Sequence, residues 1–130
     1  MNEPNPDMDA RAYFLRASET DNFVLPRCER CGHWAWPPRE LCDRCGASGW
    51  RWESASARGT LLSLATVWRG AGEGFQEEVP YDLVLVKLDE GPEFITHAAS
   101  DQLTSGKAVR LVWRPVAGRP WPCAVPEEEP

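Results

Sequence analysis

Residues 28–46, CERCGHWAWPPRELCDRCG, decide the fold of this chain. They contain two Cys-x-x-Cys pairs, Cys28–Cys31 and Cys42–Cys45, separated by ten residues, and a glycine follows each pair. Two thiols spaced in this way on a tight turn can bind one metal ion, and the glycine permits the positive φ with which the chain turns away. Two such knuckles facing one another complete a tetrahedral site of four thiolates that leaves no position for water. The spacing therefore predicts one structural zinc ion bound by Cys28, Cys31, Cys42 and Cys45, which stabilises the fold and performs no catalysis.

Two alternatives for the four cysteines stay open. They could be unligated core residues, or they could hold iron in a rubredoxin-like redox site, because a tetrahedral sulfur site suits either metal. The paired spacing of four of the five cysteines favours metal ligation in a reducing cytoplasm over disulfides. His33 directly follows the first knuckle, but four thiolates already fill the coordination shell, so we predict a supporting or surface role for it.

The bulk composition limits the class of protein. A length of 130 residues with 42% hydrophobic residues and seven tryptophans suits one domain, or a metal-bound module followed by a small barrel. A net charge of -6 argues against a generic nucleic-acid binder, whose affinity comes mostly from phosphate contacts. No stretch has the length of a membrane span, and the acidic, proline-rich N-terminus is unlike a secretory signal. The sequence predicts a soluble cytoplasmic protein.

The hydrophobic periodicity changes along the chain. Ala10, Tyr13, Phe14 and Ala17 have helical spacing, which predicts a short amphipathic helix that must dock on another surface. Period-two alternation begins at about Trp50, and four segments of it predict strands: 61–68, 81–88, 94–98 and 108–115. Gly59 precedes the first, where a strand could bend or bulge. The connections are a Gly-rich acidic loop (69–80), a turn (89–92) and a turn or short helix (100–107), which together indicate a small antiparallel barrel or sandwich.

These pieces together resemble the zinc-ribbon and OB-fold proteins that accompany thiolase-superfamily enzymes, a family first described as a domain of unknown function. The resemblance covers residues 13–121, and its segments besides the ribbon are AYFLRASETDNFVLPRC, GWRWESASARGTL, VPYDLVLVKLDEG and LTSGKAVRLVWRP. It implies a mainly β fold with an N-terminal helix, a rubredoxin-like zinc ribbon and a five-stranded OB-fold barrel. The expected boundaries are 1–22 for the tail and docking helix, 23–52 for the ribbon, 53–126 for the barrel and 127–130 for an acidic tail.

The resemblance also implies a function. Such proteins are non-catalytic accessory subunits of a thiolase, a lipid-transfer-type aldolase of steroid side-chain breakdown, or an acyltransferase. They help to hold an acyl-CoA or a bulky acyl substrate at the interface shared with the partner's active site. This chain departs from that pattern in the loop 69–80, where Glu73, Glu77 and Glu78 would repel the phosphates of CoA. The departure argues against direct CoA binding by this chain and leaves the partner role intact.

Aromatic and arginine residues crowd the ribbon, a composition typical of binding hot spots. We predict that a partner interface includes part of this set: Tyr13, Phe14, Trp34, Trp36, Arg39, Trp50 and Trp52. The alternative is that the four tryptophans all pack between ribbon and barrel.

Two other functions, single-stranded nucleic-acid binding and an independent enzyme or electron carrier, fit the sequence less well. Single-stranded nucleic-acid binding would use stacking residues such as Phe75, Phe94 and Trp113, but these lack surrounding lysines. An independent enzyme or electron carrier would need a catalytic constellation or iron, and neither a Ser-His-Asp pattern nor a phosphate-binding loop is evident. Cys123 as a nucleophile would need His97 as its base, and an apolar position near the end of the barrel explains Cys123 more simply.

Overall fold

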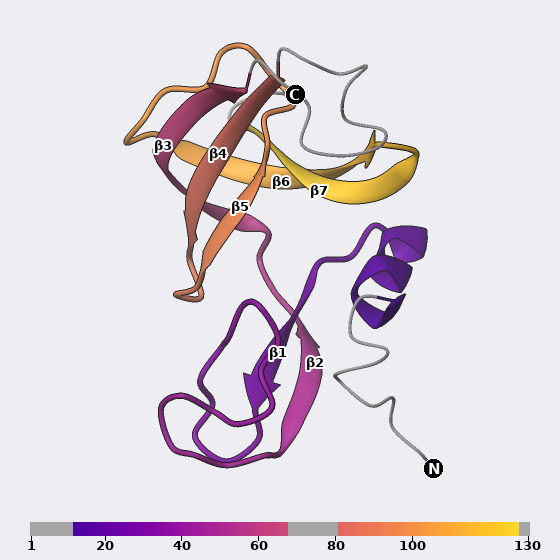
Figure 1. The fold of residues 1–130 in the computed structure, drawn as a ribbon, viewed down its shortest axis with the longest axis vertical. Helices are drawn as coiled ribbons and strands as arrows, with labels where there is room; N and C mark the ends of the chain where they lie inside the picture. Colours follow the sequence, from indigo (N-terminus) through magenta and orange to yellow (C-terminus); the bar gives the residue numbers. More distant parts are fainter. Residues whose placement is uncertain (1–11, 68–80, 128–130) are drawn as a thin grey trace. The chain divides into compact units, whose positions relative to one another are not determined.

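The computed structural model describes residues 12–67 and 81–127 (Figure 1). The chain divides into two compact units, Met1–Ser56 with Glu90–Pro92 and Ala57–Asp89 with Glu93–Pro130. The first unit holds the cysteines and a two-stranded sheet, and the second holds a five-stranded sheet. Each unit has its own buried residues. No helix in the described ranges has the length and apolar character needed to cross a membrane.

The N-terminal helix docks on the ribbon within the first unit. Residues 12–16 are α-helical and continue into the 3₁₀ helix η1 (Ala17–Thr20), which ends at Asp21 with a left-handed φ of 55°. Phe14 is 1% exposed and packs against the ring of Trp36, with centroids 4.7 Å apart, and edge-on against Phe23. The predicted helix therefore exists, and Phe14 anchors it. Ala10, part of the predicted face, lies outside the described residues.

The ribbon is built on the antiparallel pair β1 (Val24–Cys28) and β2 (Trp50–Ser54). Val24, Leu25, Pro26 and Cys28 of β1 are buried. Cys28 pairs with Trp50 at the end of the ladder, so the first knuckle begins where the sheet ends. Sequence periodicity did not indicate β1, because Pro26 and a nearly continuous apolar run hide its alternation.

The second unit is a barrel of five antiparallel strands in the order β5-β4-β3-β6-β7. The strands are β3 (Arg58–Val67), β4 (Tyr81–Leu88), β5 (Glu93–His97), β6 (Ala108–Val116) and β7 (Arg119–Pro126). The two edge strands meet through a parallel bridge between Ala98 and Ala124, and the Ala99 N–H donates to the Ala124 carbonyl at 2.8 Å. The Thr96 hydroxyl donates to the carbonyl of Pro122 at the same seam. This closure confirms the predicted OB-like barrel.

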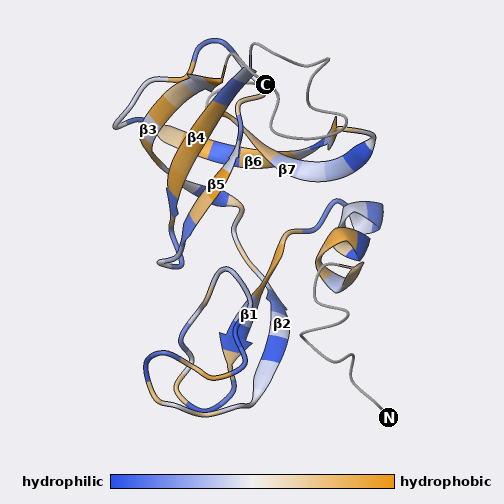
Figure 2. Cartoon of the chain, viewed as in Figure 1, coloured by the Kyte–Doolittle hydropathy of each residue, from blue (hydrophilic) through white to orange (hydrophobic). Residues whose placement is uncertain are grey.

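Alternate residues of the barrel strands fill its interior. Figure 2 shows the hydrophobic colouring of β4, an inner strand of this sheet. Inward-facing side chains are Leu61, Val84, Val86, Leu88, Phe94, Val109 and Leu111, all buried. Phe94 also stacks on Trp121 of β7. Burial alternates along β4 and the first half of β6, with Val84 and Val86 and then Val109 and Leu111 inside. Residues 100–107 form turns rather than a short helix, and the loop 69–80 lies outside the described residues.

Gly59 of β3 has no room for a side chain beside β4. A Cβ atom there would collide with the carbonyl oxygen of Lys87 and lie 2.8 Å from Cγ1 of Val86. The predicted bulge also exists, although it lies beyond Gly59, between Leu61 and Ser63, where Leu62 is the extra residue. Glycine and bulge together let β3 bend around the barrel.

The strand β7 extends the barrel beyond the last strand that periodicity predicted. Its hairpin with β6 turns at Ala117 and Gly118, whose φ values of 52° and 81° are those of a type I′ turn. Three prolines between residues 119 and 126 obscured this strand in the sequence. Cys123 lies on β7 and is buried, with its thiol 3.5 Å from the carbonyl oxygen of Trp121.

Candidate metal centre

The two Cys-x-x-Cys knuckles have the same local structure. Each has the pattern Cys, acid, Arg, Cys, Gly, in residues 28–32 and 42–46. The Gly32 N–H donates to the Cys28 carbonyl at 2.9 Å, and the Gly46 N–H donates to the Cys42 carbonyl at 2.8 Å. Both glycines have a φ close to 80°. The two turns have the same geometry, and both cysteines of each knuckle face the other knuckle.

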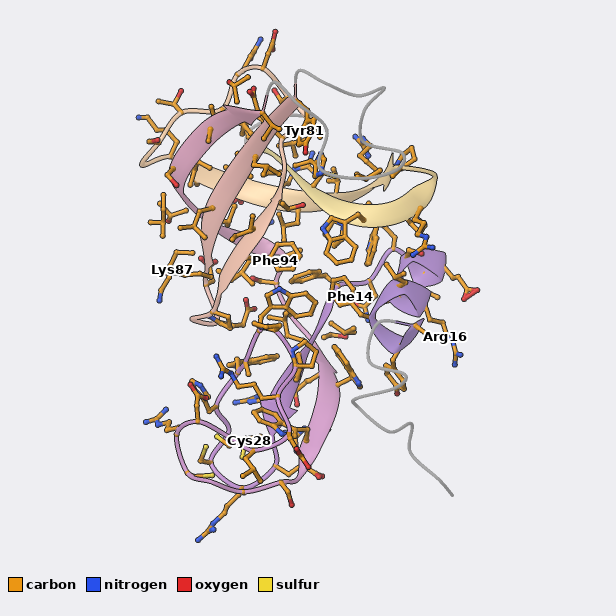
Figure 3. All side chains as sticks on the ribbon, in the orientation of Figure 1. Phe14, Arg16, Cys28, Tyr81, Lys87 and Phe94 are labelled. Atoms are coloured by element: carbon orange, nitrogen blue, oxygen red, sulfur yellow. The ribbon has the colours of Figure 1, made fainter. Side chains whose placement is uncertain are left out.

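The four thiol groups converge on one point. The Sγ–Sγ distance is 3.6 Å between Cys28 and Cys45 and 3.7 Å between Cys31 and Cys42, and all four sulfurs lie within 4.8 Å of one another. Four ligands at the usual Zn–S distance of about 2.3 Å would be separated by about 3.8 Å in a tetrahedron. The cluster beside the labelled Cys28 in Figure 3 therefore fits one four-coordinate ion.

The protonation of the free thiols is uneven. The backbone N–H of Cys31 lowers the pKa of Cys28 to about 6. The backbone N–H of His33 lowers the pKa of Cys31, but desolvation and the neighbouring thiols of Cys45, Cys42 and Cys28 outweigh it and raise this pKa to about 11. The Arg44 N–H also donates to Cys42 Sγ at 3.4 Å. A bound metal ion must displace the thiol protons, so its affinity depends on pH.

Side chains around the cysteines brace the two knuckles. His33 Nε2 lies 3.1 Å from Asp43 Oδ1, which joins the residue after the first knuckle to the interior of the second. This contact agrees with the supporting or surface role that the sequence predicts for His33. Asp43 as its partner was not foreseen, because the pairing requires the knuckles to face one another.

Arg27 connects the first knuckle to the two-stranded sheet. Its Nε donates to the carbonyl of Gly32 at 3.0 Å, and its Nη1 donates to Glu53 Oε2 at 2.6 Å. Its guanidinium lies 4.7 Å from the ring centroid of Trp34. Arg51 Nε donates to the other oxygen of Glu53 at 2.8 Å, so Arg27, and then Arg51, lower the pKa of Glu53. Sequence reasoning missed this network, because Arg27 and Arg51 become neighbours only in the register of β1 with β2.

The predicted interface residues separate into distinct places. Tyr13, Phe14, Trp36 and Trp52 form one aromatic cluster, in which Tyr13 stacks on Trp52 with centroids 5.5 Å apart. Trp34 lies under Arg27. The indole N–H of Trp50 donates to the carbonyl of Glu40, and Arg39 is exposed. All four tryptophans are half-buried, so each keeps some surface for a further contact.

His97 and Cys123, the base and nucleophile considered from the sequence, lie at the seam where β5 and β7 meet. His97 stacks on Tyr81, with ring centroids 4.7 Å apart and planes inclined by 14°. The bridge between Ala98 and Ala124 places His97 and Cys123 on neighbouring strands. Cys123 is buried in the barrel wall, as its apolar interpretation predicted.

Comparisons with known proteins agree with both units. The family model "ChsH2, rubredoxin-like zinc ribbon domain" matches residues 20–51, and "ChsH2, C-terminal OB-fold domain" matches residues 52–114. The chain is 29% identical to a DUF35 domain-containing scaffold protein of Pyrococcus furiosus, over 84% of this chain and 81% of that protein. It is 30% identical to a probable enoyl-CoA hydratase alpha subunit of Thermomonospora curvata over 85% of this chain, but it spans 35% of the length of that relative.

Two solved structures resemble the fold. A chain of the Ltp2-ChsH2(DUF35) aldolase superposes with a TM-score of 0.74 at 27% identity, covering 89% of this chain and 93% of that one. A protein of unknown function from the DUF35 family of Sulfolobus solfataricus superposes with a TM-score of 0.58 at 15% identity, covering 80% and 78%. The zinc ribbon, its four cysteines and the OB-fold thus agree in sequence and in structure. The chain therefore belongs to the family of ChsH2-type (DUF35) proteins, which carry a rubredoxin-like zinc ribbon followed by an OB-fold domain.

Proposed function

We propose that this chain is a non-catalytic accessory subunit of a thiolase-superfamily enzyme. The observation that carries the proposal is the likeness, across 89% of the chain, to a chain of the Ltp2-ChsH2(DUF35) aldolase. Relatives described as scaffold proteins support a role in assembly. The partner is a thiolase, a lipid-transfer-type aldolase or an acyltransferase, and this chain shapes its active site.

The metal centre supports a structural role. Four thiolates complete a tetrahedral shell, so a zinc ion bound there has no open position for a water or a substrate. Zinc would neutralise repulsion among the thiolates and hold the knuckles together. The chain's own residues, chiefly Arg27 and the His33–Asp43 pair, orient the turns that present the sulfurs.

The proposed substrate class is supported by the description of one relative. A similar segment lies in a protein described as an enoyl-CoA hydratase subunit, which supports an acyl-CoA or bulky acyl substrate at the interface with the partner. Since this chain spans 35% of that protein, the hydration reaction is not carried over. The paired thiols also favour the reducing cytoplasm as the compartment.

The half-buried aromatic residues of the first unit are proposed as partner contacts. Tyr13 and Trp52 form a stacked pair with remaining exposed surface, and Trp34, Trp36, Trp50 and the exposed Arg39 belong to the same unit. Aromatic side chains with exposed faces and arginine are the residue types that dominate binding energy at interfaces. Phe14, which is buried, contributes by fixing the helix that carries Tyr13.

Affinity purification of the tagged chain from its native cells tests the proposal. We expect a thiolase-fold protein in near-equal amount, identified by mass spectrometry. The purified partner should gain turnover of an acyl-CoA substrate when the chain is added. Recovery of nucleic acid, or of the chain alone, would contradict the accessory role.

A pair of matched variants connects this result to the metal centre. The double variant Cys42→Ser/Cys45→Ser removes half of the ligands and should abolish both zinc binding and partner stimulation. Cys123→Ala changes a cysteine of the barrel that lies outside the cluster and should retain both. Equal stimulation by both variants would show that the ribbon has no part in the complex.

A further inference from the structure

An exposed apolar surface lies on the outside of the barrel. We call it the outer face, and it consists of Leu62, Leu83, Leu85 and Ile95. Ile95 is 64% exposed and Leu62 is 44% exposed, whereas Leu83 and Leu85 are partly exposed. Singly exposed apolar residues are ordinary, but a contiguous group on one sheet face indicates a binding surface.

The strand register makes this group contiguous. Leu85 of β4 lies opposite Ile95 of β5 on one side and opposite Ser63 of β3 on the other. Leu62 is the extra residue of the bulge, next to Ser63. Because Val84 and Val86 are buried inside the barrel, Leu83 and Leu85 alternate to its outside.

The sequence of β4 supports the same conclusion independently. Residues 83–86 are LVLV, an unbroken apolar run, and Figure 2 shows it as continuous hydrophobic colouring along β4. Such a run is typical of a strand covered on both faces, whereas a strand with one solvated face alternates. The barrel core covers one face of β4. On the outer side, Ile95 of the neighbouring strand β5 is 64% exposed, so most of the Ile95 side chain is not covered by the described part of the chain, and Leu85 is partly exposed.

The position of the outer face within the fold also indicates binding. The second and third strands of an OB barrel, here β4 and β5, form the face with which such barrels bind their ligands. Polar side chains border the apolar centre at one end, where Lys87 of β4 lies opposite Glu93 of β5. Lys87 points outward from the barrel (Figure 3). An apolar centre with a polar rim of balanced charge is the anatomy of a protein–protein interface.

The chemistry of the outer face selects the occupant. Among its described residues and their neighbours on β4 and β5, Lys87 is the one permanent cation, so a nucleic-acid backbone would find no basic groove. An acyl chain requires a concave site that buries most of its surface, and a sheet face would leave one side of it in water. Two copies of this chain would approach with like charges of -6 each. These arguments leave an uncharged apolar surface of a different protein as the occupant that fits the outer face.

We infer that the outer face is a docking surface for an apolar patch of the partner enzyme subunit, separate from the contacts proposed for the zinc ribbon. The inference rests on the proposed function, because it takes the thiolase-superfamily subunit as the occupant. Docking would cover Ile95 and Leu85 and leave Lys87 and Glu93 at the rim. A chain held by its ribbon and by its barrel would be fixed in orientation on the partner.

The test compares three variants of the full-length chain, each titrated against the purified partner subunit recovered with the tagged wild type. Ile95→Lys places a charge at the centre of the outer face and should weaken binding by about tenfold or more. Ile95→Val keeps a β-branched apolar side chain and should bind as wild type does. Ala108→Lys adds the same charge at an exposed position of β6 and should also bind normally. Unchanged melting temperatures and metal content would show that Ile95→Lys folds correctly.

Each outcome decides the inference. Weak binding by Ile95→Lys alone supports it. Normal binding by Ile95→Lys beside a wild type that binds overturns it and leaves the accessory function standing. A wild type that binds no thiolase-superfamily subunit overturns the function and the inference together. Sedimentation that shows a wild-type dimer dispersed by Ile95→Lys would assign the outer face to a second copy and overturn the inference.

Discussion

Glu53 is the carboxylate that joins two arginines across the two-stranded sheet of the first unit. Its two carboxylate oxygens accept hydrogen bonds from Arg27 and Arg51, which would otherwise face each other as like charges across the ladder. We expect Glu53→Gln to lower the melting temperature of the zinc-bound chain at pH 7. Glu40→Gln, at an exposed position of the same ribbon, is the matched control and should change little.

The pH dependence of that difference follows from the lowered pKa of Glu53. Arg27 and Arg51 hold this pKa below its ordinary value of 4.5, so the folded state binds the proton less well than the unfolded state does. The stabilisation is therefore fully present above about pH 4.5 and is lost as the pH falls through the lower, folded pKa. Melting curves of the wild type and Glu53→Gln should converge in acid. A difference that grows in acid would show that the ion pairs are not its source.

Gly59 carries a steric requirement of the barrel. An added methyl group would collide with the Lys87 carbonyl and with Val86, so Gly59→Ala should destabilise the chain by about 1–3 kcal/mol. Gly49→Ala is the control, because a Cβ at Gly49 approaches only the movable side chain of Glu29. Urea unfolding of each variant, followed with one probe in the barrel and one in the first unit, measures both changes. Equal stability of the two variants would mean that β3 and β4 can separate at no cost.

At the scale of elements, the N-terminal helix depends on one side chain. Phe14 contacts Phe23, Trp36 and Trp52, and its removal would leave a cavity among three aromatic rings. We expect Phe14→Ala to cost about 3–5 kcal/mol and to release the helix from the ribbon. Tryptophan fluorescence should shift to longer wavelength because Trp36 and Trp52 become more exposed to solvent. Leu15→Ala, one residue further along the same helix and only half-buried, should keep the wild-type spectrum.

The elements also show how far a sequence can predict a fold of this kind. The cysteine spacing predicted the metal centre, and alternation predicted β3, β4 and β6, because each signal is local. Pro26 and the prolines of β7 hid their strands, since proline is unfavourable within a ladder and lowers the expectation of one. The sequence did not indicate that Arg27, Asp43 and Glu53 make the contacts that hold the knuckles in place. Apart from the Arg51–Glu53 pair, which is two residues apart, their contacts join residues 5 to 26 positions apart and depend on the strand register and on the facing of the two knuckles.

At the scale of the whole molecule, the two compact units should respond differently to loss of the metal. The first unit has a small core organised around the four cysteines, whereas the barrel has an apolar core of its own. Structural zinc contributes on the order of 10 kcal/mol in small modules of this type. A strong chelator should therefore unfold the first unit and leave the second folded.

Amide NMR spectra distinguish these responses. After chelation, resonances of residues 24–54 should lose their dispersion, whereas those of strands β3 to β7 should persist, and added zinc should restore the first set. A coloured, iron-loaded protein as isolated from its native cells would point to the rubredoxin-like alternative. Spectra unchanged by complete metal removal would show that the cysteines pack without a ligand.

The bulge at Leu62 sets the parity of the strand that contains it. Leu61 and Leu64 both lie opposite inward-facing residues of β4, although they are three positions apart and a regular strand would send them to opposite sides. The single extra residue reverses, midway along β3, the alternation of side chains between the two faces of the sheet. Without Leu62, residues 63–67 would have to exchange their inward-facing and outward-facing side chains, or shift their pairing with β4 by one residue. A length change of one residue here thus changes which face of the sheet half of β3 presents, while the strand order of the barrel stays the same.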